Sequence, residues 1–255
     1  MTENLRVSVD GAVATVTIDR PDKRNALSFA MWSAFPEIAQ DLAADPRVRV
    51  VVVTGGAHFS AGADISEFRS LRSDADGARR YQSAVHDAGR ALALLGKPTI
   101  AAINGFCVGG GCEIALACDL RVAADDARFG ITPAKLGIVF ALPSTKQLVD
   151  AVGPAWAKQI LFTGEILDAS TALRIGLVNE LHPADAVPAR ARALAEVIAS
   201  RSQVSVRGAK TIVTRITDGL TDEDEVVHSL YEASVTSADY AEGVAAFLEK
   251  RAPVF

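Results

Sequence analysis

The stretch TIAAINGFCVGGGCE, residues 99–113, decides the fold. Its first five residues, Thr99–Ile103, are an apolar run with the length of a buried strand. The glycine-rich stretch Gly105–Gly111 predicts a turn, and a helix is expected to open at Glu113–Ala117. Strand, glycine turn and helix in this order are typical of an α/β protein, in which ligands collect where buried strands end.

A second glycine-rich turn, HFSAGAD at residues 58–64, follows the valine-rich strand Val48–Thr54. Both turns therefore leave the carboxyl ends of buried strands, where free backbone N–H groups can hold a negative oxygen. One N–H from each turn would make an oxyanion hole, and Glu113 would meet what the hole binds. Three structural alternatives stay open: a packing turn at the glycines, Glu113 as a helix-dipole partner, and Asp64 as a helix cap.

The rest of the chain predicts an α/β core followed by a helical tail. A hairpin is expected about Asp10-Gly11, and a helix capped by Ser28 is expected to kink or restart at Pro36. Helices are also expected at 142–152, 155–161, 185–200, 203–217, 221–236 and 238–249. The last helix carries an apolar stripe at helical spacing, formed by Tyr240, Val244, Phe247 and Leu248.

Composition excludes several classes of protein. The chain has 255 residues, 49% of them hydrophobic and 22% charged, with a net charge of −5 and no dense Lys/Arg run, which disfavours nucleic-acid binding. The three cysteines form no CxxC pair and the four histidines are scattered, so no metal site is expected. Glu113 and the glycines argue against a membrane span at Thr99–Cys118, and the polar N-terminus shows no signal peptide. A cytoplasmic enzyme is expected.

Nucleotide and serine-hydrolase motifs are missing from the sequence. It has no G-x-G-x-x-G near residues 105–114, no phosphate-binding P-loop and no G-x-S-x-G elbow. Several short segments, in order and spacing, instead resemble the crotonase superfamily, the enoyl-CoA hydratase/isomerase family, over nearly the whole chain. These are Asn25–Ser28, Phe59–Ile65, Ile103–Gly105, Gly109–Glu113, Cys118-Asp119, Phe129-Gly130, Leu136-Gly137, Phe162–Gly164, Gly176–Val178 and Phe247–Arg251.

The resemblance implies an α/β fold of repeated ββα units wound into a spiral, with a C-terminal helical subdomain. Residues 1–200 would form the spiral core with the acyl-CoA site, and residues 201–255 would form a trimerisation subdomain. The resemblance further implies a homotrimer or a hexamer made of two trimers. An acyl-CoA thioester would be the substrate, so CoA is part of the substrate and no separate cofactor is expected.

Site residues carry over by position. Ala63 and Gly110 would supply the two oxyanion N–H groups, and Glu113 would be the general acid/base. Lys23 and Arg24 would meet CoA phosphates, although solvated-face interpretations of Lys23, Arg24 and Lys250 stay open. The full set expected at CoA is Lys23, Arg24, Ala26, Leu27, Ala61, Asp64, Ile65, Phe247 and Lys250, the last two at the adenine end in a neighbouring subunit.

Two positions depart from the family pattern. Family hydratases carry a second glutamate four residues after Phe129, and this chain has Pro133 there. Some acyl-CoA decarboxylases of the family place a tyrosine three residues after the Leu-Gly pair, where this chain has Phe140. The acyl pocket is expected to include Pro133, Phe140 and two residues of the helix after the first motif, Tyr81 and His86.

The sequence therefore predicts an acyl-CoA enzyme, with hydratase-type lyase activity as the leading hypothesis. A different enolate reaction, namely decarboxylation, isomerisation or thioester hydrolysis, is the first alternative. A weakly catalytic acyl-CoA-binding subunit is the second, because Pro133 cannot transfer a proton.

Overall fold

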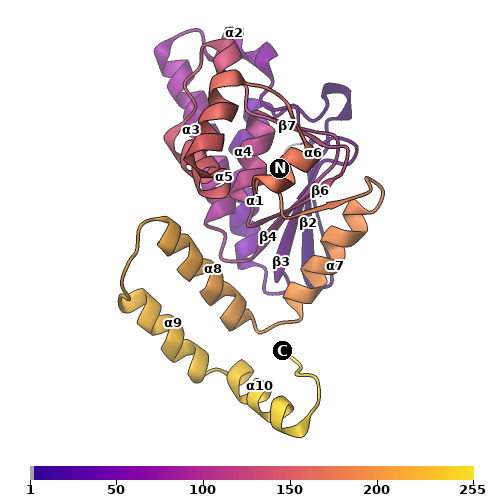
Figure 1. The fold of residues 1–255 in the computed structure, drawn as a ribbon, viewed down its shortest axis with the longest axis vertical. Helices are drawn as coiled ribbons and strands as arrows, with labels where there is room; N and C mark the ends of the chain where they lie inside the picture. Colours follow the sequence, from indigo (N-terminus) through magenta and orange to yellow (C-terminus); the bar gives the residue numbers. More distant parts are fainter. Residues whose placement is uncertain (1–2) are drawn as a thin grey trace.

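A computed structural model describes residues 3–255 and shows an α/β body with a helical arm (Figure 1). The strands are β1 (Leu5–Asp10), β2 (Val13–Ile18), β3 (Val50–Thr54), β4 (Thr99–Ile103), β5 (Phe106–Val108), β6 (Leu120–Ala124), β7 (Arg128–Gly130), β8 (Leu167–Asp168) and β9 (Glu180–His182). The α-helices are α1 (Phe29–Ala44), α2 (Phe68–Leu71), α3 (Ala75–Ala93), α4 (Gly110–Ala117), α5 (Leu142–Thr163), α6 (Ala169–Arg174), α7 (Val187–Ala199), α8 (Gln203–Thr217), α9 (Glu225–Val235) and α10 (Ala238–Glu249). Short 3₁₀ helices are η1 (Pro21–Lys23), η2 (Ile65–Glu67) and η3 (Pro133–Leu136).

The larger sheet has the strand order β1-β2-β3-β4-β6-β9. Its only antiparallel pair among the described residues is the β1–β2 hairpin predicted about Asp10-Gly11; every later neighbour is parallel. Parallel strands are buried on both faces, so their sequences are continuous runs of apolar residues. Val50–Val53 and Thr99–Ile103 show this pattern and are buried along their length.

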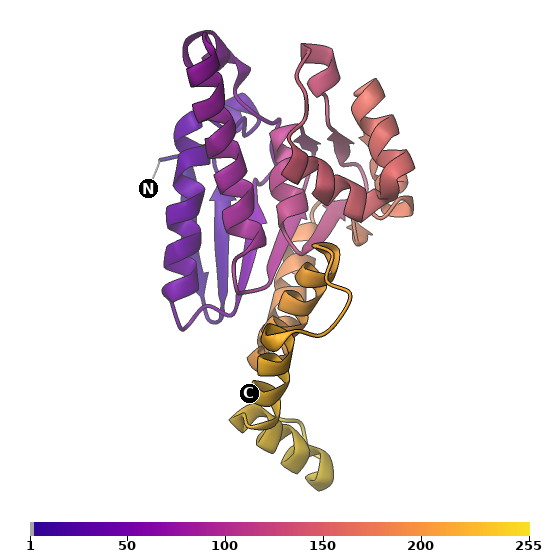
Figure 2. The ribbon, with the colours of Figure 1, turned by 90° about the vertical axis from the view of Figure 1, so that its left-hand side faces the viewer.

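Helices cover both faces of this sheet. On one side α7 packs against β2, β3, β4 and β6. On the other side α1 and α3 pack against each other, and Figure 2 shows them in front of the strands. Trp32 and Phe35 of α1 are fully buried in the core between the layers.

A three-stranded sheet, β5-β7-β8, corrects the expected turn at Gly105–Gly111. Gly105 and Gly109 both have positive φ (55° and 53°), so they form two separate turns that flank strand β5. Strand β5 pairs with β7, with Cys107 opposite Phe129. Helix α4 consequently begins at Gly110, three residues before the predicted start at Glu113.

The two internal prolines of the long helices behave differently. Helix α1 continues through Pro36 and does not restart there, since Trp32, Phe35, Ile38 and Ala39 hold its buried face on both sides of the proline. In α5 the predicted division is confirmed, because Gly153 before Pro154 adopts φ 75° and ψ 164° and interrupts the helix.

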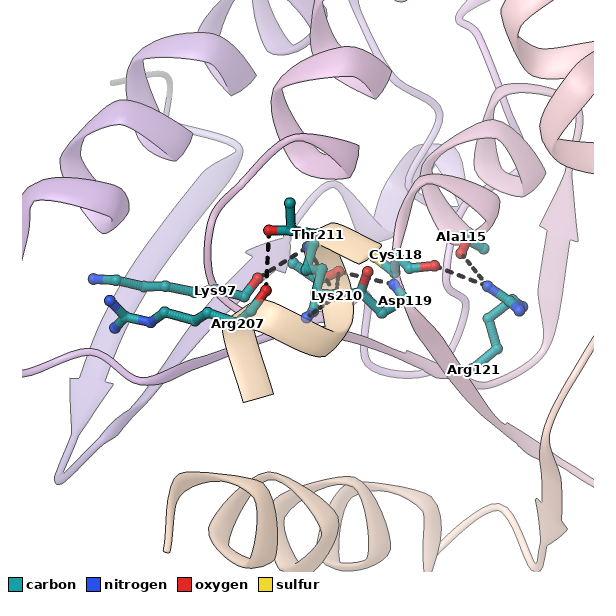
Figure 3. Close-up of polar contacts among 9 residues, drawn as sticks. Lys97, Ala115, Cys118, Asp119, Arg121, Arg207, Lys210 and Thr211 are labelled. Atoms are coloured by element: carbon teal, nitrogen blue, oxygen red, sulfur yellow. Dashed lines mark hydrogen bonds and ion pairs between the residues drawn. The ribbon is translucent and has the colours of Figure 1, made fainter. Parts of the chain in front are cut away.

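Helices α8–α10 extend away from the body as an arm (Figures 1 and 2). The arm is attached near its base by Lys210, whose Nζ donates to Asp119 Oδ2 (2.8 Å) and to the Lys97 carbonyl (3.0 Å), as Figure 3 shows. Asp119 Oδ2 also accepts from the backbone N–H of Thr99 (2.7 Å) at the start of β4. The arm is thereby tied to the strand that leads into the second glycine turn.

The apolar stripe predicted on α10 lies open to solvent in the single chain. Phe247 is 83% exposed and Leu248 is 74% exposed, and Tyr240 and Val244 are also exposed. Within residues 3–255, none of the helices combines the length and hydropathy needed to cross a lipid bilayer.

Lys97 gives a test of the packing between α1 and β4. Its buried Nζ donates to the carbonyls of Leu42 (2.5 Å) and Asp45 (2.6 Å) at the end of α1. We expect Lys97→Met to lower the free energy of unfolding by about 1–3 kcal/mol, because buried carbonyls lose their donor. Urea unfolding followed by circular dichroism measures this change, and the exposed Lys158→Met is the matched control. Equal stability of the two variants would contradict the assigned role.

Candidate active site

Backbone pairing through Ser60 brings the two glycine-rich segments together. The Ser60 N–H donates to the Phe106 carbonyl (2.9 Å), and the Val108 N–H donates to the Ser60 carbonyl (2.9 Å). Ser60 and Cys107 therefore form a parallel bridge between segments more than forty residues apart in the chain. The residues that follow each segment, 61–64 and 109–113, are led to the same side of the molecule.

Two buried polar side chains, Ser60 and Asn25, stabilise this junction between the two glycine-rich segments. Ser60 Oγ donates to the Asn25 carbonyl (2.7 Å) and accepts from the Gly62 N–H (3.1 Å). Asn25 is 2% exposed, and its Nδ2 donates to the carbonyls of Gly55 (2.6 Å) and His58 (2.5 Å). No role for either residue follows from the sequence alone, although both stand in its family motifs. Their signal was a polar side chain inside an otherwise apolar or glycine-rich motif.

The glycines at 109 and 110 are needed for different reasons. Gly109 has φ 53° and ψ −118°, a backbone conformation that a residue with a Cβ rarely adopts. A Cβ on Gly110 would lie 2.6 Å and 2.8 Å from two ring carbons of Trp32. The glycine run is therefore a packing requirement, and it also lets the α4 N-terminus approach the neighbouring loop.

The amides of Ala63 and Gly110 face one cavity. Neither N–H has a hydrogen-bond acceptor within residues 3–255, while the flanking Leu27 N–H donates to Gly62 and the Asp64 N–H donates to Leu27. Both residues line a cavity of about 210 Å³. A Cβ built on Gly110 would lie 3.4 Å from the Ala63 nitrogen, so the two amides are close neighbours. Two free donors in one cavity have the arrangement of an oxyanion hole.

Glu113 stands one helical turn beyond Gly110 and lines the same cavity. It is the cavity's only carboxylate among the described residues. Burial raises the pKa of Glu113, and the nearby Ser144 hydroxyl opposes this shift. A raised pKa makes the carboxylate a stronger base, which favours proton transfer to it.

The four residues expected at the acyl pocket fall into two cavities. Tyr81, Pro133 and Phe140 line the 210 Å³ cavity with the free amides. His86 lines a separate cavity of about 490 Å³, which Glu113 also borders. Glu113 therefore borders both cavities, and His86 borders only the larger one.

The residues expected at CoA are spread over four places. Ala61 and Ile65 line the 210 Å³ cavity. Lys23 and Arg24 lie exposed on the η1 turn, and the Arg24 guanidinium carbon lies 5.4 Å from the centre of the Phe106 ring. Ala26 and the fully buried Leu27 lie beside the first motif, where the Leu27 N–H donates to the Gly62 carbonyl (2.7 Å). Phe247 and Lys250 are in the arm and line neither cavity beside Glu113.

The carboxylate of Asp64 is engaged within the fold. Its Oδ2 accepts from Arg20 Nη1 (2.7 Å), and its Oδ1 accepts from the Ser66 N–H (3.0 Å). The Ser66 hydroxyl and Arg20 hold the pKa of Asp64 below its ordinary value. Asp64 therefore caps η2, as the helix-cap interpretation of this residue predicts. Across residues 3–255, no three His, Cys, Asp or Glu side chains are arranged to hold a metal ion.

Comparison with known proteins identifies the family. The family described as Enoyl-CoA hydratase/isomerase matches residues 8–255, and the chain belongs to this family. The protein named "Probable enoyl-CoA hydratase echA8" of Mycobacterium tuberculosis is 37% identical, covering 99% of this chain and 98% of that one. The short-chain-enoyl-CoA hydratase of Clostridium acetobutylicum is 36% identical, covering 97% and 95%.

Solved structures agree with this assignment. The crystal structure of an enoyl-CoA hydratase/isomerase family protein from Hyphomonas neptunium superposes with a TM-score of 0.96 at 40% identity, covering 99% of this chain and 97% of that one. The enoyl-CoA hydratase of Bacillus anthracis gives a TM-score of 0.91 at 32% identity, covering 99% of each chain. The crotonase fold predicted from the sequence motifs is therefore confirmed.

Gly110→Ala tests the geometry of the two amides. We expect catalytic turnover of an acyl-CoA substrate to fall by about 10²–10³-fold, the loss that follows removal of one oxyanion donor. The new Cβ cannot fit against the Trp32 ring without moving the Gly110 amide. Steady-state kinetics measure the effect. Gly208→Ala in α8, where a Cβ meets no atom within 4 Å, is the control and should keep full activity.

Proposed function

We propose that this enzyme adds water across the double bond of an enoyl-CoA thioester. One observation carries the proposal: two free backbone N–H groups and a single carboxylate with a raised pKa line the same cavity. The names of the full-length relatives, which are enoyl-CoA hydratases at 36–37% identity, support it.

The chemistry follows from the placement of charge. The thioester oxygen accepts from the Ala63 and Gly110 N–H groups, so negative charge that enters the α-carbon is stabilised as an enolate. Water attacks the β-carbon while Glu113 takes one of its protons, and the same proton then returns to the α-carbon. Each oxyanion donor contributes about 2.7–4 kcal/mol of transition-state stabilisation, and a positioned acid/base contributes about 10²–10⁴-fold.

Pro133 favours a second candidate. The cavity offers one proton-carrying carboxylate, because a proline lines it at the position where the family resemblance implies a second glutamate. Isomerisation moves one proton between two carbons, and decarboxylation creates the enolate without a base. Either reaction needs only the oxyanion hole and at most one acid/base.

CoA recognition is proposed at the mouth of this cavity. Ala61 and Ile65 border the opening, and the exposed cations Lys23 and Arg24 lie on the adjoining η1 loop, which suits the CoA phosphates. CoA enters as part of the substrate, and the proposed reaction needs no further cofactor. The three free, buried thiols fit the reducing conditions of the cytoplasm, which we propose as the location.

Assembly into a homotrimer or a hexamer is proposed for the arm. An exposed apolar stripe on α10 gains about 25 cal/mol for each Å² removed from water, so contact with another subunit stabilises it. The same contact would bring Phe247 and Lys250 to a neighbouring subunit's CoA site.

Glu113→Gln tests the role of the carboxylate. The amide keeps the shape of the side chain and loses its basicity, so we expect crotonyl-CoA hydration to fall by at least about 10²-fold while acyl-CoA still binds. Loss of the enoyl absorbance reports turnover, and calorimetry with butyryl-CoA reports binding. Unchanged turnover in the variant would contradict the assignment of Glu113. Mass spectrometry of products from a panel of acyl-CoAs separates hydration from isomerisation and decarboxylation.

The same variant has a predicted pH signature in stability. Burial raises the Glu113 pKa above its ordinary 4.5, so the folded protein holds this proton more tightly than the unfolded chain. The group's contribution to stability is therefore full below pH 4.5 and declines as pH rises through the raised pKa. We expect Glu113→Gln to be more stable than the wild type at pH 7 and equal to it at pH 4. A wild type that is more stable than the variant at pH 7 would contradict this prediction, because the fold would then stabilise the ionised form of Glu113.

Light scattering tests the assembly. The wild-type protein is expected to have the mass of three or six chains at micromolar concentration. Phe247→Asp should reduce this mass, because it places a charge in the apolar stripe. Val9→Asp, at an exposed valine on β1, is the control and should leave the mass unchanged. A wild-type monomer would contradict the proposal.

A further inference from the structure

Arg72 is a cation in the wall of the cavity that holds the free amides. It is half-buried at the end of α2 and lines the 210 Å³ cavity together with Ala63, Gly110 and Glu113. Its guanidinium carbon lies 4.5 Å from the centre of the Phe68 ring and 5.7 Å from that of Tyr81. Stacking on two rings positions the guanidinium without using its hydrogen-bond donors.

No carboxylate within residues 3–255 pairs with Arg72, and its side chain makes no hydrogen bond to that part of the chain. Acidic side chains on the surrounding segment have other partners. Asp64 binds Arg20, Glu67 accepts from the Phe29 N–H (2.8 Å), Asp74 accepts from the Gly77 N–H (2.7 Å) and Asp76 pairs with Arg79. The donors of Arg72 are therefore available to a ligand.

A second polar group in the same wall has no acceptor. Tyr81 is 3% exposed and lines the cavity, and within residues 3–255 its hydroxyl makes no hydrogen bond; the polar side chain beside it, the Trp32 indole, is a donor and cannot accept the phenolic hydrogen. Burial raises its pKa to about 12, so the hydroxyl stays a neutral donor at physiological pH. A buried hydroxyl without a partner is costly unless a ligand supplies one.

Another part of the cavity lining is apolar. It is formed by residues that cannot satisfy a charge, namely Leu136, Ile138, Val139, Phe140 and Ala141. A saturated or simple unsaturated alkyl chain would fit such a wall and leave the guanidinium and the phenol unpaired. An acyl group that ends in a carboxylate would fill the same volume and accept from both donors.

We propose that Arg72, assisted by the Tyr81 hydroxyl, selects acyl groups that carry a carboxylate at the far end of the chain. This inference names a substrate class for the proposed function and rests on it. The juxtaposition that carries it lies in the cavity of the free amides: a guanidinium that stacks on two rings and pairs with no acid of residues 3–255, beside a buried phenol whose hydrogen has no acceptor there. The preferred substrates are CoA monothioesters of unsaturated dicarboxylic acids.

A matched pair of substrates tests the selection. Hex-2-enoyl-CoA and 2,3-dehydroadipyl-CoA share a six-carbon chain and a double bond, and only the second ends in a carboxylate. We expect kcat/KM to favour 2,3-dehydroadipyl-CoA by about tenfold or more. Arg72→Met should lower kcat/KM for it by about 10–100-fold, the value of one charge-assisted hydrogen-bonded pair, and should change hexenoyl-CoA by less than about twofold.

Three further variants sharpen the result. Arg69→Met removes the same charge from an exposed position of α2 that lines neither cavity, and both substrates should be unaffected. Arg72→Lys should keep part of the preference, because the charge remains and the fork is lost. Tyr81→Phe should lower kcat/KM for the carboxylate substrate by about three- to tenfold.

Each contrary outcome overturns the inference. A wild-type enzyme without preference for 2,3-dehydroadipyl-CoA has no carboxylate subsite. An Arg72→Met variant that loses both substrates equally assigns Arg72 to a CoA phosphate or to folding.

A binding measurement keeps the inference testable if neither substrate is hydrated. Calorimetry then compares the unreactive adipyl-CoA with hexanoyl-CoA. An adipyl preference that Arg72→Met abolishes would support the subsite while the proposed function fails. Equal binding of the two ligands would overturn the subsite as well.

Discussion

Every feature of the site depends on the pairing of Ser60 with the backbone of β5. Through that pairing, a loop after β3 and a loop after β4 become neighbours although they are far apart in the chain. The Ser60 hydroxyl and Asn25 hold the loop after β3 in place by hydrogen bonds. The glycines at 109 and 110 allow the N-terminus of α4 to approach this loop closely. Without this junction the amides of Ala63 and Gly110 would not share a cavity with Glu113.

The proposed active site contains few charged side chains. The protein carries a net charge of −5, yet the cavity wall holds one carboxylate and one guanidinium, Glu113 and Arg72. In the proposed reaction, backbone dipoles, which need no counter-charge and do not titrate, would hold the thioester oxygen. A single proton carrier then suffices for the proposed reaction, and Pro133 leaves the acyl side of the cavity without a second acid.

Much of the fold was predictable because periodicity and turn chemistry are local. The hairpin at Asp10-Gly11, the buried strand Thr99–Ile103 and the division of α5 at Gly153 follow from residues a few positions apart. Strand β5 was missed, since its three residues lie inside a glycine-rich stretch and are held by β7, whose register depends on tertiary contacts. The absence of a restart at Pro36 has a related reason, because packing of α1 on the core outweighs the loss of one helical hydrogen bond.

The site was predictable in part. Motif resemblance indicated Ala63, Gly110 and Glu113, whose placement in one cavity rests on the folded chain. The roles of Asn25 and Ser60 in the junction, and the absence of an acidic partner for Arg72 within residues 3–255, could not be derived from spacing. Each depends on which buried groups find partners, and only the three-dimensional arrangement reveals that.

The most direct test of the central claim is the infrared spectrum of a bound thioester carbonyl. Crotonyl-CoA labelled with ¹³C at the thioester carbon would be bound to the Glu113→Gln enzyme, in which turnover is expected to be at least about 10²-fold slower. Two amide donors on the oxygen weaken the C=O bond, so the account predicts a carbonyl stretch at clearly lower frequency than in water, and loss of that shift when Gly110→Ala is added. A bound carbonyl that absorbs at its solution frequency would contradict the account.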